Sequence, residues 1–330
     1  MGRSLFSVVV LTYNQSHLVE ETLKSIYNQS YPDIELIVSD DGSTDGTPEV
    51  IEQWLDKFGK RFVKCELLVS PYNTGISANH NRGVKKTSGE FLKYIGGDDI
   101  LLPEALSKMA SFLETNQDAY VATSFVQPFI SKDNGEPVEV LPPIPEKQTL
   151  RILAQDSLYQ FRYMTRHCFL PAPGFFFRTE SLARVGYFDE EFKRFEDWHT
   201  WLKLLLNGFR IHFLPEVTVQ WRIHPNSVST SALYKGDIRF IEENILVYQK
   251  YVLPNLRLLS ILERIHVYSR IRFYKTLLKK GGTMKSLNRA RLHFLLDPIK
   301  WVEFPSWVLK QIMKKPRKKI DELFQHNGRK

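Results

Sequence analysis

An α/β fold, in which helices flank a mainly parallel sheet, is the class that this sequence predicts. Strand-like and helix-like segments alternate through the first 125 residues. The strand-like segments are continuous apolar runs, as expected for strands that are buried on both faces. Acidic clusters follow two of these runs, at residues 39–45 and 98–99. Together these observations favour an open sheet with a ligand-binding edge.

The expected strands are short runs rich in β-branched and aromatic residues, at 7–11, 34–38, 66–69, 91–95 and 119–125. The expected helices lie between them, at about 17–27, 48–58, 77–87 and 103–114. Ser16 is predicted to cap the first helix, and Thr47, which precedes Pro48, is predicted to cap the second. Because strands joined by helices of this length pair in parallel, the strand-end acids should meet at one edge.

Residues 126–173 break this alternation. They contain seven prolines, which predicts an irregular, substrate-facing insertion. Regular structure is expected to return at 174–177, and then in a helix at 197–207 that Gly208 ends. The sequence therefore predicts one domain over 1–230 and a separate helical region over 231–330.

Positive charge is concentrated at the end of the chain. Residues 231–330 hold 22 Lys and Arg against 8 Asp and Glu, whereas the other 230 residues hold 23 against 29. A basic region on an acidic body points to an anionic partner, either a membrane surface or a nucleic acid. Aromatic residues interleave with the basic ones, which suits a membrane interface. A merely solvated helix face is an equally weighted alternative.

No helix-turn-helix, zinc or RNA-binding signature accompanies the basic region, so no nucleic-acid partner is predicted. No apolar run approaches the ~18 residues that a membrane span needs, and the N-terminus shows no signal-peptide pattern. Cys65 and Cys168 are the two cysteines, and they are expected to be free thiols in a reducing compartment. These observations predict a cytoplasmic protein that attaches peripherally to the cytoplasmic face of a membrane.

Asp98 and Asp99 are adjacent carboxylates at the end of an apolar run. Their mutual repulsion is costly unless a positive charge, usually a metal ion, offsets it. Together with the acids at 39–45, they predict a divalent cation that holds a phosphorylated ligand. The sequence lacks Gly-x-Gly-x-x-Gly, Gly-x-x-x-x-Gly-Lys-[Ser/Thr] and Gly-x-Ser-x-Gly. This argues against dinucleotide-dependent redox, P-loop and α/β-hydrolase chemistry.

Three segments carry a family resemblance: Val-Val-Leu-Thr-Tyr-Asn at 9–14, Val-Ser-Asp-Asp-Gly-Ser-Thr-Asp at 38–45 and Gly-Gly-Asp-Asp at 96–99. They closely resemble glycosyltransferase family 2, whose members are inverting, nucleotide-sugar-dependent enzymes of the GT-A fold. The resemblance continues through Val-Gly-Tyr-Phe-Asp-Glu at 185–190, Phe-Glu-Asp-Trp at 195–198 and Trp-Arg-Ile-His-Pro at 221–225. It covers roughly residues 5–230, in family order and spacing.

The resemblance implies different functions for different parts of the chain. It makes 1–230 a GT-A catalytic domain, with a nucleotide-binding half at 1–125 and an acceptor-facing half at 126–230. It implies that the nucleotide-sugar contacts these residues: Thr12, Tyr13, Asn14, Asp40, Asp41, Arg82 and Asp98. Thr12 and Tyr13 would line the base and ribose pocket, and Asp40 or Asp41 would accept a hydrogen bond from a ring N–H of uracil.

The resemblance also implies a cofactor and a base. Asp99 would hold Mg²⁺ or Mn²⁺ on the diphosphate, Asp98 would face the ribose, and His224 would reach the metal or the diphosphate. Asp197 would be the base that deprotonates the acceptor hydroxyl. This sequence departs from the family at two positions. Gly97 stands where relatives have the first acid of Asp-x-Asp, and His80 stands where many have Arg, which weakens the assignment of Arg82 to the diphosphate.

Each residue type alone also has a structural interpretation. Asp197 could simply be a helix N-cap, and Asp98–Asp99 could cap the helix after Pro103. The acids after residue 39 could form a turn, His224 could be structural, and the aromatic run at 175–177 could be core. For each residue taken alone, the structural interpretation is at least as favoured as the functional one. Taken together, the residues favour the functional interpretation, because chance would have to place every segment in family order.

The sequence thus predicts an inverting hexosyltransferase that moves a sugar, most simply from a UDP-sugar, to a glycan or lipid-linked glycan in cell-surface polysaccharide or lipopolysaccharide biosynthesis. Two alternatives stay open. One is a sugar-phosphate nucleotidyltransferase, which would need a Gly-x-Gly-x-Arg loop where Thr12-Tyr13-Asn14 stands. The other is a non-catalytic, membrane-associated scaffold of the same fold. The sequence does not fix the oligomeric state.

Overall fold

The computed structural model describes residues 3–132, 135–224 and 238–279. The chain divides into two compact units, 1–224 and 225–330, and each is described by itself. The domain boundary predicted at 230 falls within 225–237, outside the described residues, and stays a prediction.

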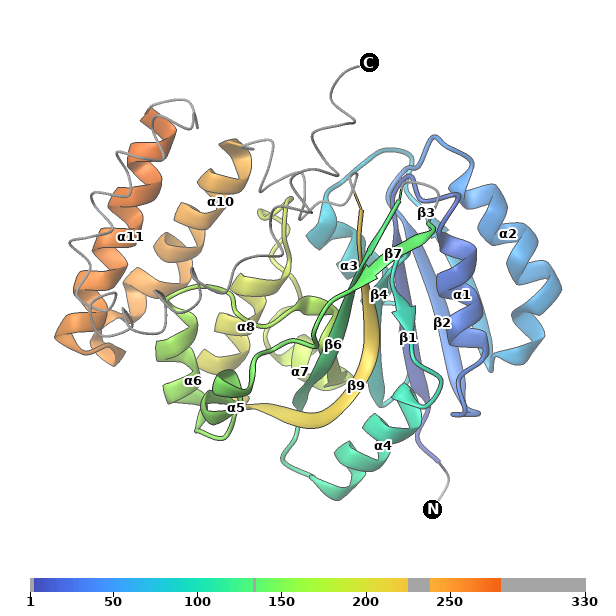
Figure 1. Cartoon of the computed structure of the whole chain (residues 1–330), viewed down its shortest axis with the longest axis horizontal. Helices are drawn as coiled ribbons and strands as arrows, with labels where there is room; N and C mark the ends of the chain where they lie inside the picture. The colour runs from blue at the N-terminus through green and yellow to red at the C-terminus, as the bar shows by residue number, and fades with distance from the viewer. Residues whose placement is uncertain (1–2, 133–134, 225–237, 280–330) are drawn as a thin grey trace. The chain divides into compact units, whose positions relative to one another are not determined.

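The first unit is built on one mixed sheet (Figure 1). Its strands are, in chain order, β1 (Phe6–Thr12), β2 (Ile34–Asp40), β3 (Lys64–Val69), β4 (Phe91–Gly96), β5 (Ile100–Leu101), β6 (Val121–Ser131), β7 (Pro137–Val140), β8 (Phe175–Arg178) and β9 (Ile211–Ile223). The order across the sheet is β3-β2-β1-β4-β8-β6-β9-β5, with β7 paired to β6. The neighbours β3-β2-β1-β4 are parallel, and β6 is parallel to β9. Strands β7 and β8 pair antiparallel with their neighbours, as the short β5 does with β9.

Helices cover both faces of this sheet. They are α1 (Val19–Tyr27), α2 (Thr47–Phe58), α3 (Ile76–Val84), α4 (Ala105–Thr115), α5 (Lys147–Leu153), α6 (Ser157–Met164), α7 (Thr179–Arg184) and α8 (Asp197–Leu206). Helices α1, α2 and α4 bury their apolar residues in one core cluster with Val8 and Val10 of β1. On the other face, Gly83 of α3 lies so close to Val9 that a Cβ would approach its Cγ1 to 2.4 Å.

The strands predicted in the first 96 residues are confirmed, each within two residues at its ends. The two predicted helix caps are wrong. Helix α1 begins after Leu18 with no side-chain cap, because the first N–H groups of this turn, those of Leu18 and Val19, donate to the backbone carbonyl of Gln15 instead. The cap of α2 is Gly46 in the left-handed region, and Thr47 is already helical.

The insertion predicted at 126–173 is more regular than expected. Strand β6 runs on to Ser131, and β7, α5 and α6 follow within the same stretch. Pro128 lies within β6, in register with Trp221 of β9, and its carbonyl accepts from the N–H of Leu141, the residue after β7. This proline therefore does not end the strand.

The aromatic run of β8 is core, which confirms the structural interpretation of that motif. Phe175, Phe176 and Phe177 are fully buried. Phe175 stacks on Trp201 of α8, with ring centroids 3.6 Å apart and planes at 11°. This contact fixes α8 against the sheet, so the first residue of α8 has a defined place.

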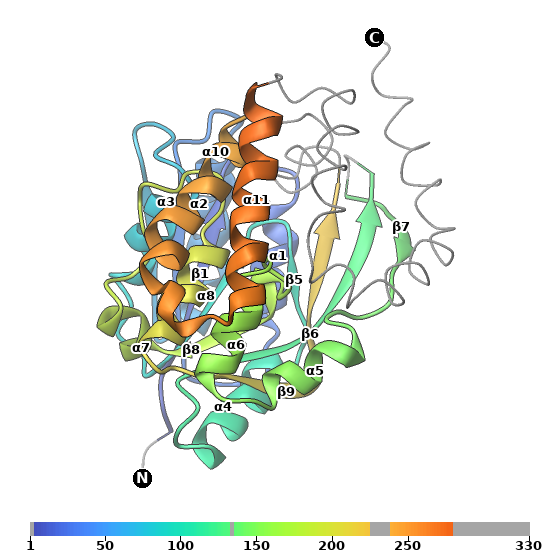
Figure 2. The ribbon, with the colours of Figure 1, turned by 90° about the vertical axis from the view of Figure 1, so that its left-hand side faces the viewer.

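The second unit is helical in its described part. It contains α10 (Ile238–Val247), a π-helical turn η3 (Tyr248–Val252), a 3-10 segment η4 (Leu253–Leu258) and α11 (Ile261–Lys279). Helices α10 and α11 lie side by side (Figure 2). No helix in the described residues is both long and apolar enough to cross a membrane. The basic run at 314–319 and the aromatic residues at 301–307 lie outside the described part.

Candidate active site

The strand ends that the sequence singled out lie at one edge of the sheet. Thr12 at the end of β1 is in register with Asp40 at the end of β2, and Leu11 is in register with Gly96 of β4. The N–H of Gly97 donates to the carbonyl of Leu11 over 2.9 Å. The acidic clusters therefore meet beyond the carboxyl ends of three parallel strands, where open α/β sheets bind ligands.

Asp40 is fully buried and organises the first loop of this edge. One carboxylate oxygen accepts from the hydroxyls of Thr12 (2.7 Å) and Ser43 (2.6 Å), and the other accepts from the N–H of Ser43. Asn14 joins the same loop, because its N–H donates to Ser43 Oγ and its Oδ1 accepts from the N–H of Thr44. Tyr13, which lies between Thr12 and Asn14 in the sequence, is 46% exposed and is therefore accessible to a ligand.

Asp41 fixes the position of the loop before α3. Its carboxylate accepts from the N–H and hydroxyl of Thr74 and from the N–H of Gly75, which precedes α3. Arg82 of α3 reaches it over 3.2 Å. Gly42 beside it has φ +76°, and a Cβ there would meet the backbone of Tyr72 at 2.6 Å. No turn is assigned at residues 41–43, and the Asp41 carboxylate instead fixes the segment that leads into α3.

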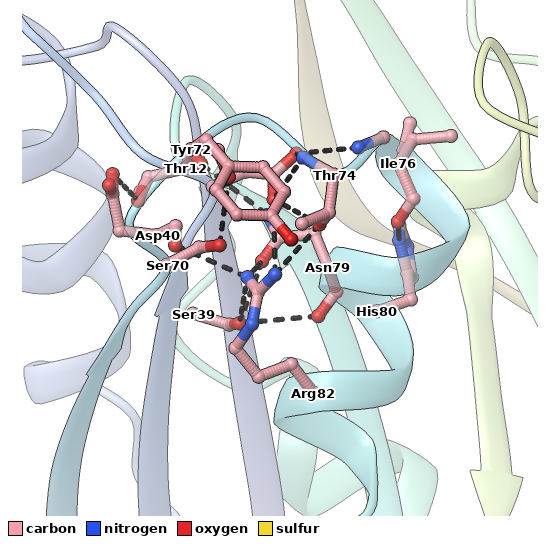
Figure 3. Close-up of polar contacts among 12 residues, drawn as sticks. Thr12, Ser39, Asp40, Ser70, Tyr72, Thr74, Ile76, Asn79, His80 and Arg82 are labelled. Carbon is pink, nitrogen blue, oxygen red and sulfur yellow. Dashed lines mark hydrogen bonds and ion pairs between the residues drawn. The ribbon is translucent and has the colours of Figure 1, made fainter. Parts of the chain in front are cut away.

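Arg82 is bound within the protein in this structure. Its guanidinium donates to Asn79 Oδ1 (2.8 Å), Thr74 Oγ1 (2.7 Å) and the carbonyl of Asp40 (3.2 Å), as Figure 3 shows. His80 leaves α3 on the opposite side, and its Nδ1 lies 2.8 Å from the carbonyl of Ile76. The residue that replaces the family's arginine therefore faces a different part of the site.

Asp98 and Asp99 follow β4. Asp99 is buried, and its Oδ1 accepts from the N–H of Arg222 over 2.9 Å. Burial and the neighbouring Asp98 raise the pKa of Asp99 well above its ordinary value. Asp98 Oδ2 lies 3.1 Å from Nε2 of His224. The structure thus brings His224 into contact with Asp98, and its predicted reach to the metal or the diphosphate stays a prediction.

A divalent cation suits these donors. Carboxylate oxygens with an imidazole nitrogen are ligands that Mn²⁺ accepts, and a cation would relieve the repulsion that raises the pKa of Asp99. No group of three or more His, Cys, Asp and Glu side chains in the described residues is arranged to hold a metal. A cation here would therefore need ligands from outside the protein, such as diphosphate oxygens and water.

Arg222 is a site residue that the sequence reading did not assign. It is 1% exposed on β9, and its guanidinium donates to the carbonyls of Asp98 (2.8 Å) and Gly135 (2.7 Å) and to Glu21 of α1. It therefore fastens the Asp98–Asp99 turn to α1 and β9. The sequence does contain a signal for it, because an arginine within a strand-like apolar run is expected to be buried and a buried charge needs hydrogen-bond or ion-pair partners.

Asp197 is the first residue of α8, and Glu196 is its N-cap residue. The N-cap interpretation of Asp197 is therefore wrong, although its Oδ1 does accept from the N–H of Trp198 over 2.7 Å. Its Oδ2 accepts from the thiol of Cys168 over 3.4 Å. Burial raises the pKa of Asp197, and burial together with Asp197 raises the pKa of Glu196 to about 8.

This acid pair is connected to the strand edge through the start of α3. The N–H of Ile76 donates to the carbonyl of Lys193, and Gly75 is packed so closely that a Cβ would lie 2.9 Å from Lys193. His80 Nε2 lies 3.7 Å from Glu196. One short helix start thus contacts both Asp41 and the segment that leads to Asp197.

Comparison with known proteins identifies the family. The model of glycosyl transferase family 2 matches residues 7–186, which is more than half of the chain. This chain belongs to glycosyl transferase family 2. The chain is therefore a glycosyltransferase, and the nucleotidyltransferase alternative is set aside.

Curated relatives of this family 2 glycosyltransferase include an uncharacterized glycosyltransferase of Haemophilus influenzae, 26% identical over 97% of this chain and 98% of the relative. A GalNAc(5)-diNAcBac-PP-undecaprenol beta-1,3-glucosyltransferase of Campylobacter jejuni is 43% identical over 31% of this chain and 32% of its own. The first likeness extends over both units of the present chain, whereas the second is confined to less than a third of it.

Two solved structures share the fold. A mannosyltransferase from Pyrobaculum calidifontis, in complex with GDP-Man and Mn²⁺, superposes with a TM-score of 0.58 at 18% identity, over 98% of this chain and 85% of that one. S. aureus TarS in complex with UDP-GlcNAc gives 0.55 at 22% identity, over 82% and 72%. At these identities the likeness establishes the fold, and it confirms the GT-A prediction.

Proposed function

We propose that this glycosyltransferase moves a sugar from a nucleotide-diphosphate sugar, a UDP-sugar, to a hydroxyl of a glycan acceptor with inversion. The observation that supports it is the meeting of Thr12, Asp40 and Asp41 with Asp98 and Asp99 at one sheet edge. The base and ribose of such a donor would lie at Thr12, Asp40 and Asp41, with Asp98 facing the ribose, and its diphosphate and cation would lie at Asp99. The nucleotide-sugar complexes of the two structural neighbours support the same class of donor.

The loops around β1 and β2 would form the base and ribose pocket. Thr12 and Asn14 are fixed by Asp40 and the loop after it, so Tyr13 is presented from a defined backbone. Asp40 or Asp41 accepts from the uracil ring N–H, and Asp98 faces the ribose. Arg82 would turn to the diphosphate by exchanging the neutral acceptors Asn79 and Thr74 for phosphate oxygens, which form stronger charge-assisted bonds.

Asp99 and His224 would hold Mg²⁺ or Mn²⁺. When bound, the cation neutralises charge that develops on the departing diphosphate. The protein's own part is to keep Asp99 in place through the N–H of Arg222, and to keep the turn in place through the guanidinium of the same residue. The conformation of the two acids is therefore set by β9 before any ligand binds.

Asp197 would act as the general base. It takes the proton of the acceptor hydroxyl while the hydroxyl oxygen bonds to the anomeric carbon and the bond from that carbon to the diphosphate oxygen breaks. The products are the glycoside and the nucleoside diphosphate, and the proton stays on Asp197. Attack from the side opposite the leaving group inverts the anomeric centre. The raised pKa of Asp197 suits a base, which works best when its pKa approaches the working pH.

The acceptor is proposed to be carried by a lipid, in polysaccharide assembly at the cytoplasmic face of a membrane. The name of the Campylobacter relative describes an undecaprenol-linked substrate, which supports this class of acceptor. Helix α11 adds a second support, because its exposed face runs Ile261, Ile265, Tyr268, Arg272, Lys275 and Lys279. The exposed residues of its first half are mainly apolar, with Ile261 75% exposed and Arg264 as the basic exception, and those of its second half are basic, as a surface that meets anionic lipid should be.

A donor panel tests the proposed function. Nucleotide release from UDP-, GDP-, dTDP- and CMP-sugars is measured with the full chain and Mn²⁺, with and without short glycan acceptors. We expect one UDP-sugar to be consumed well above the others. Nucleotide release from a GDP-sugar alone would overturn the assignment of uracil as the nucleobase of the donor. Folded protein that releases nucleotide from no donor would favour the scaffold alternative.

A further inference from the structure

Two acids, Glu196 and Asp197, are adjacent at the start of α8, and desolvation raises the pKa of each. Glu196 is 7% exposed, and Asp197, which follows it directly, is partly exposed. Burial and the charge of Asp197 raise the pKa of Glu196 to about 8, so one of the two carboxyls carries a proton at neutral pH. The chemistry of the site depends on which of them is ionised.

Donors gather on Asp197. Its two oxygens accept from the N–H of Trp198 (2.7 Å) and the thiol of Cys168 (3.4 Å). Cys168 lies on the loop after α6, and its thiol has a second acceptor in the carbonyl of Leu170 (3.6 Å). Burial and the nearby Asp197 raise the pKa of Cys168. The thiol therefore keeps its proton at neutral pH and acts as a donor.

Glu196 accepts from its own backbone N–H and also faces an acceptor side chain. Burial lowers the pKa of His80 to about 4, so its ring is neutral near pH 7. Because Nδ1 donates to the carbonyl of Ile76, Nε2 carries the lone pair, and it lies 3.7 Å from Glu196 Oε1. This nitrogen has no hydrogen-bond partner in the described part of the chain. A lone pair beside Glu196 favours a protonated carboxyl there.

We propose that Cys168 is a positioning residue, which donates its S–H to Asp197 and so makes Asp197 the ionised member of the pair while Glu196 keeps the shared proton. The inference rests on the proposed role of Asp197 as the base. Cys168 touches neither substrate in this account. It fixes the orientation and the charge of the group that does.

Loss of the thiol should change the pH dependence in a defined direction. A donor to the carboxylate stabilises its ionised form, so its removal raises the pKa of Asp197. The groups that face Asp197 are Glu196 beside it, Cys168 on the loop and Tyr94 on β4, with His80 of α3 behind Glu196. None of these is altered when Cys168 is replaced. The acid limb of kcat/KM, which reports the free enzyme, should therefore move to higher pH.

The test compares Cys168→Ala, Cys168→Ser and the control Cys65→Ala in the full chain. An S–H is a weak donor, so Cys168→Ala should lower kcat about 3- to 10-fold and move the acid limb up by roughly half a unit to one unit. Cys168→Ser retains a donor and should restore both. Cys65 lies on β3, so its replacement should change neither. Nucleotide binding and melting temperature, measured in parallel, identify variants that fail to fold.

The double variant Cys168→Ala with Asp197→Asn separates this inference from the proposed function. With no carboxylate to position, the loss of Cys168 should cost nothing beyond the loss caused by Asp197→Asn. If Asp197→Asn is inactive but Cys168→Ala has the native rate and acid limb, the inference is wrong and the base assignment stands. Equal defects in Cys168→Ala and Cys168→Ser would also contradict it. Native turnover in Asp197→Asn would overturn the base assignment and the inference together.

Discussion

At the residue scale, the buried acids differ in what surrounds them. Asp40 and Asp41 are surrounded by donors from neighbouring loops, so their charges are satisfied within the protein. Asp99 has one backbone donor, the positive charges of Lys93 and Arg222 nearby and a like charge beside it, and its pKa is nevertheless raised well above the ordinary value. A bound cation would relieve this unfavourable ionisation, whereas Asp40 and Asp41 already have their donors within the protein. This contrast agrees with the different roles that we propose for the two acidic clusters.

The surroundings of Glu196 and Asp197 also differ, which predicts different outcomes when each is replaced. Asp197→Asn keeps the shape of the side chain but cannot take a proton, and loss of a general base costs about 10²–10⁴-fold in rate. Glu196→Gln mimics the protonated carboxyl and should cost less than about tenfold. Single-turnover transfer by each variant, with donor binding as the folding control, measures the difference. Equal losses would contradict the assignment of the charge to Asp197.

Glu196 should also make the folded state sensitive to pH. Its pKa in the folded protein, about 8, lies above its ordinary value of 4.5. As the pH rises from about 4.5 to 8, the unfolded chain releases this proton and the folded chain keeps it. The stability contributed by the protonated form is therefore lost across this window. Glu196→Gln should lose less stability than the native protein as the pH rises.

Chemical denaturation of both proteins at several pH values between 4.5 and 8 measures this difference. The free energy of unfolding of Glu196→Gln, relative to the native protein, should increase steadily with pH. A difference that stays constant with pH would show that Glu196 is already ionised in the folded protein at the low end of the window.

Residues of the site could be predicted from sequence where a motif has a fixed position relative to a strand end. Thr12, Asp40 and Asp99 follow directly from strands whose apolar pattern is plain. Cys168 and Arg222 could not be assigned in this way. They lie 29 and 123 residues from the acids that they contact, and only the tertiary fold brings them there.

At the scale of elements, periodicity located the strands well and the helix starts less well. Strand ends are set by burial, which the apolar runs report directly. Helix starts depend on which loop groups compete for a capping residue. The first N–H groups of α1 donate to the backbone carbonyl of Gln15, and α2 begins one residue early, at Thr47, with Gly46 as its N-cap residue. The local sequence reports neither of these backbone arrangements.

The face of α11 is the element whose function is most directly testable. Each basic residue near an anionic surface contributes on the order of 1 kcal/mol to binding, so replacing Arg272, Lys275 and Lys279 by Gln should release the full chain from anionic vesicles. We expect the native protein to cosediment with phosphatidylserine-containing vesicles at low salt and to dissociate at high salt. Neutral vesicles should not bind it.

The matched control replaces Lys24, Lys57 and Lys60, three exposed lysines of the first unit, and makes the same change in net charge. If this control weakens vesicle binding as much as the α11 triple variant does, binding depends on net charge alone and the face of α11 is not the docking surface. Unaltered binding by the α11 variant would also refute the assignment of this helix.

At the scale of the whole molecule, the family model covers part of the first unit and none of the second. The family model matches residues 7–186, which lie wholly within the first unit. The charge of the second unit was evident from the sequence, but its function was not. A basic composition fits a membrane surface and a solvated helix equally well, and only the arrangement of exposed residues on α11 favours the first.

The most direct test of the account is the metal dependence of donor turnover. Nucleotide release from the preferred UDP-sugar is followed in EDTA-treated protein while Mn²⁺ is added back, with the native chain, Asp99→Ala and Asp98→Ala. We expect no turnover in EDTA, full recovery with Mn²⁺, almost none at any Mn²⁺ concentration in Asp99→Ala, and mainly a raised donor KM in Asp98→Ala. Full turnover by the native protein in EDTA, or by Asp99→Ala, would contradict the proposal that these strand-end acids hold a cation on the donor diphosphate.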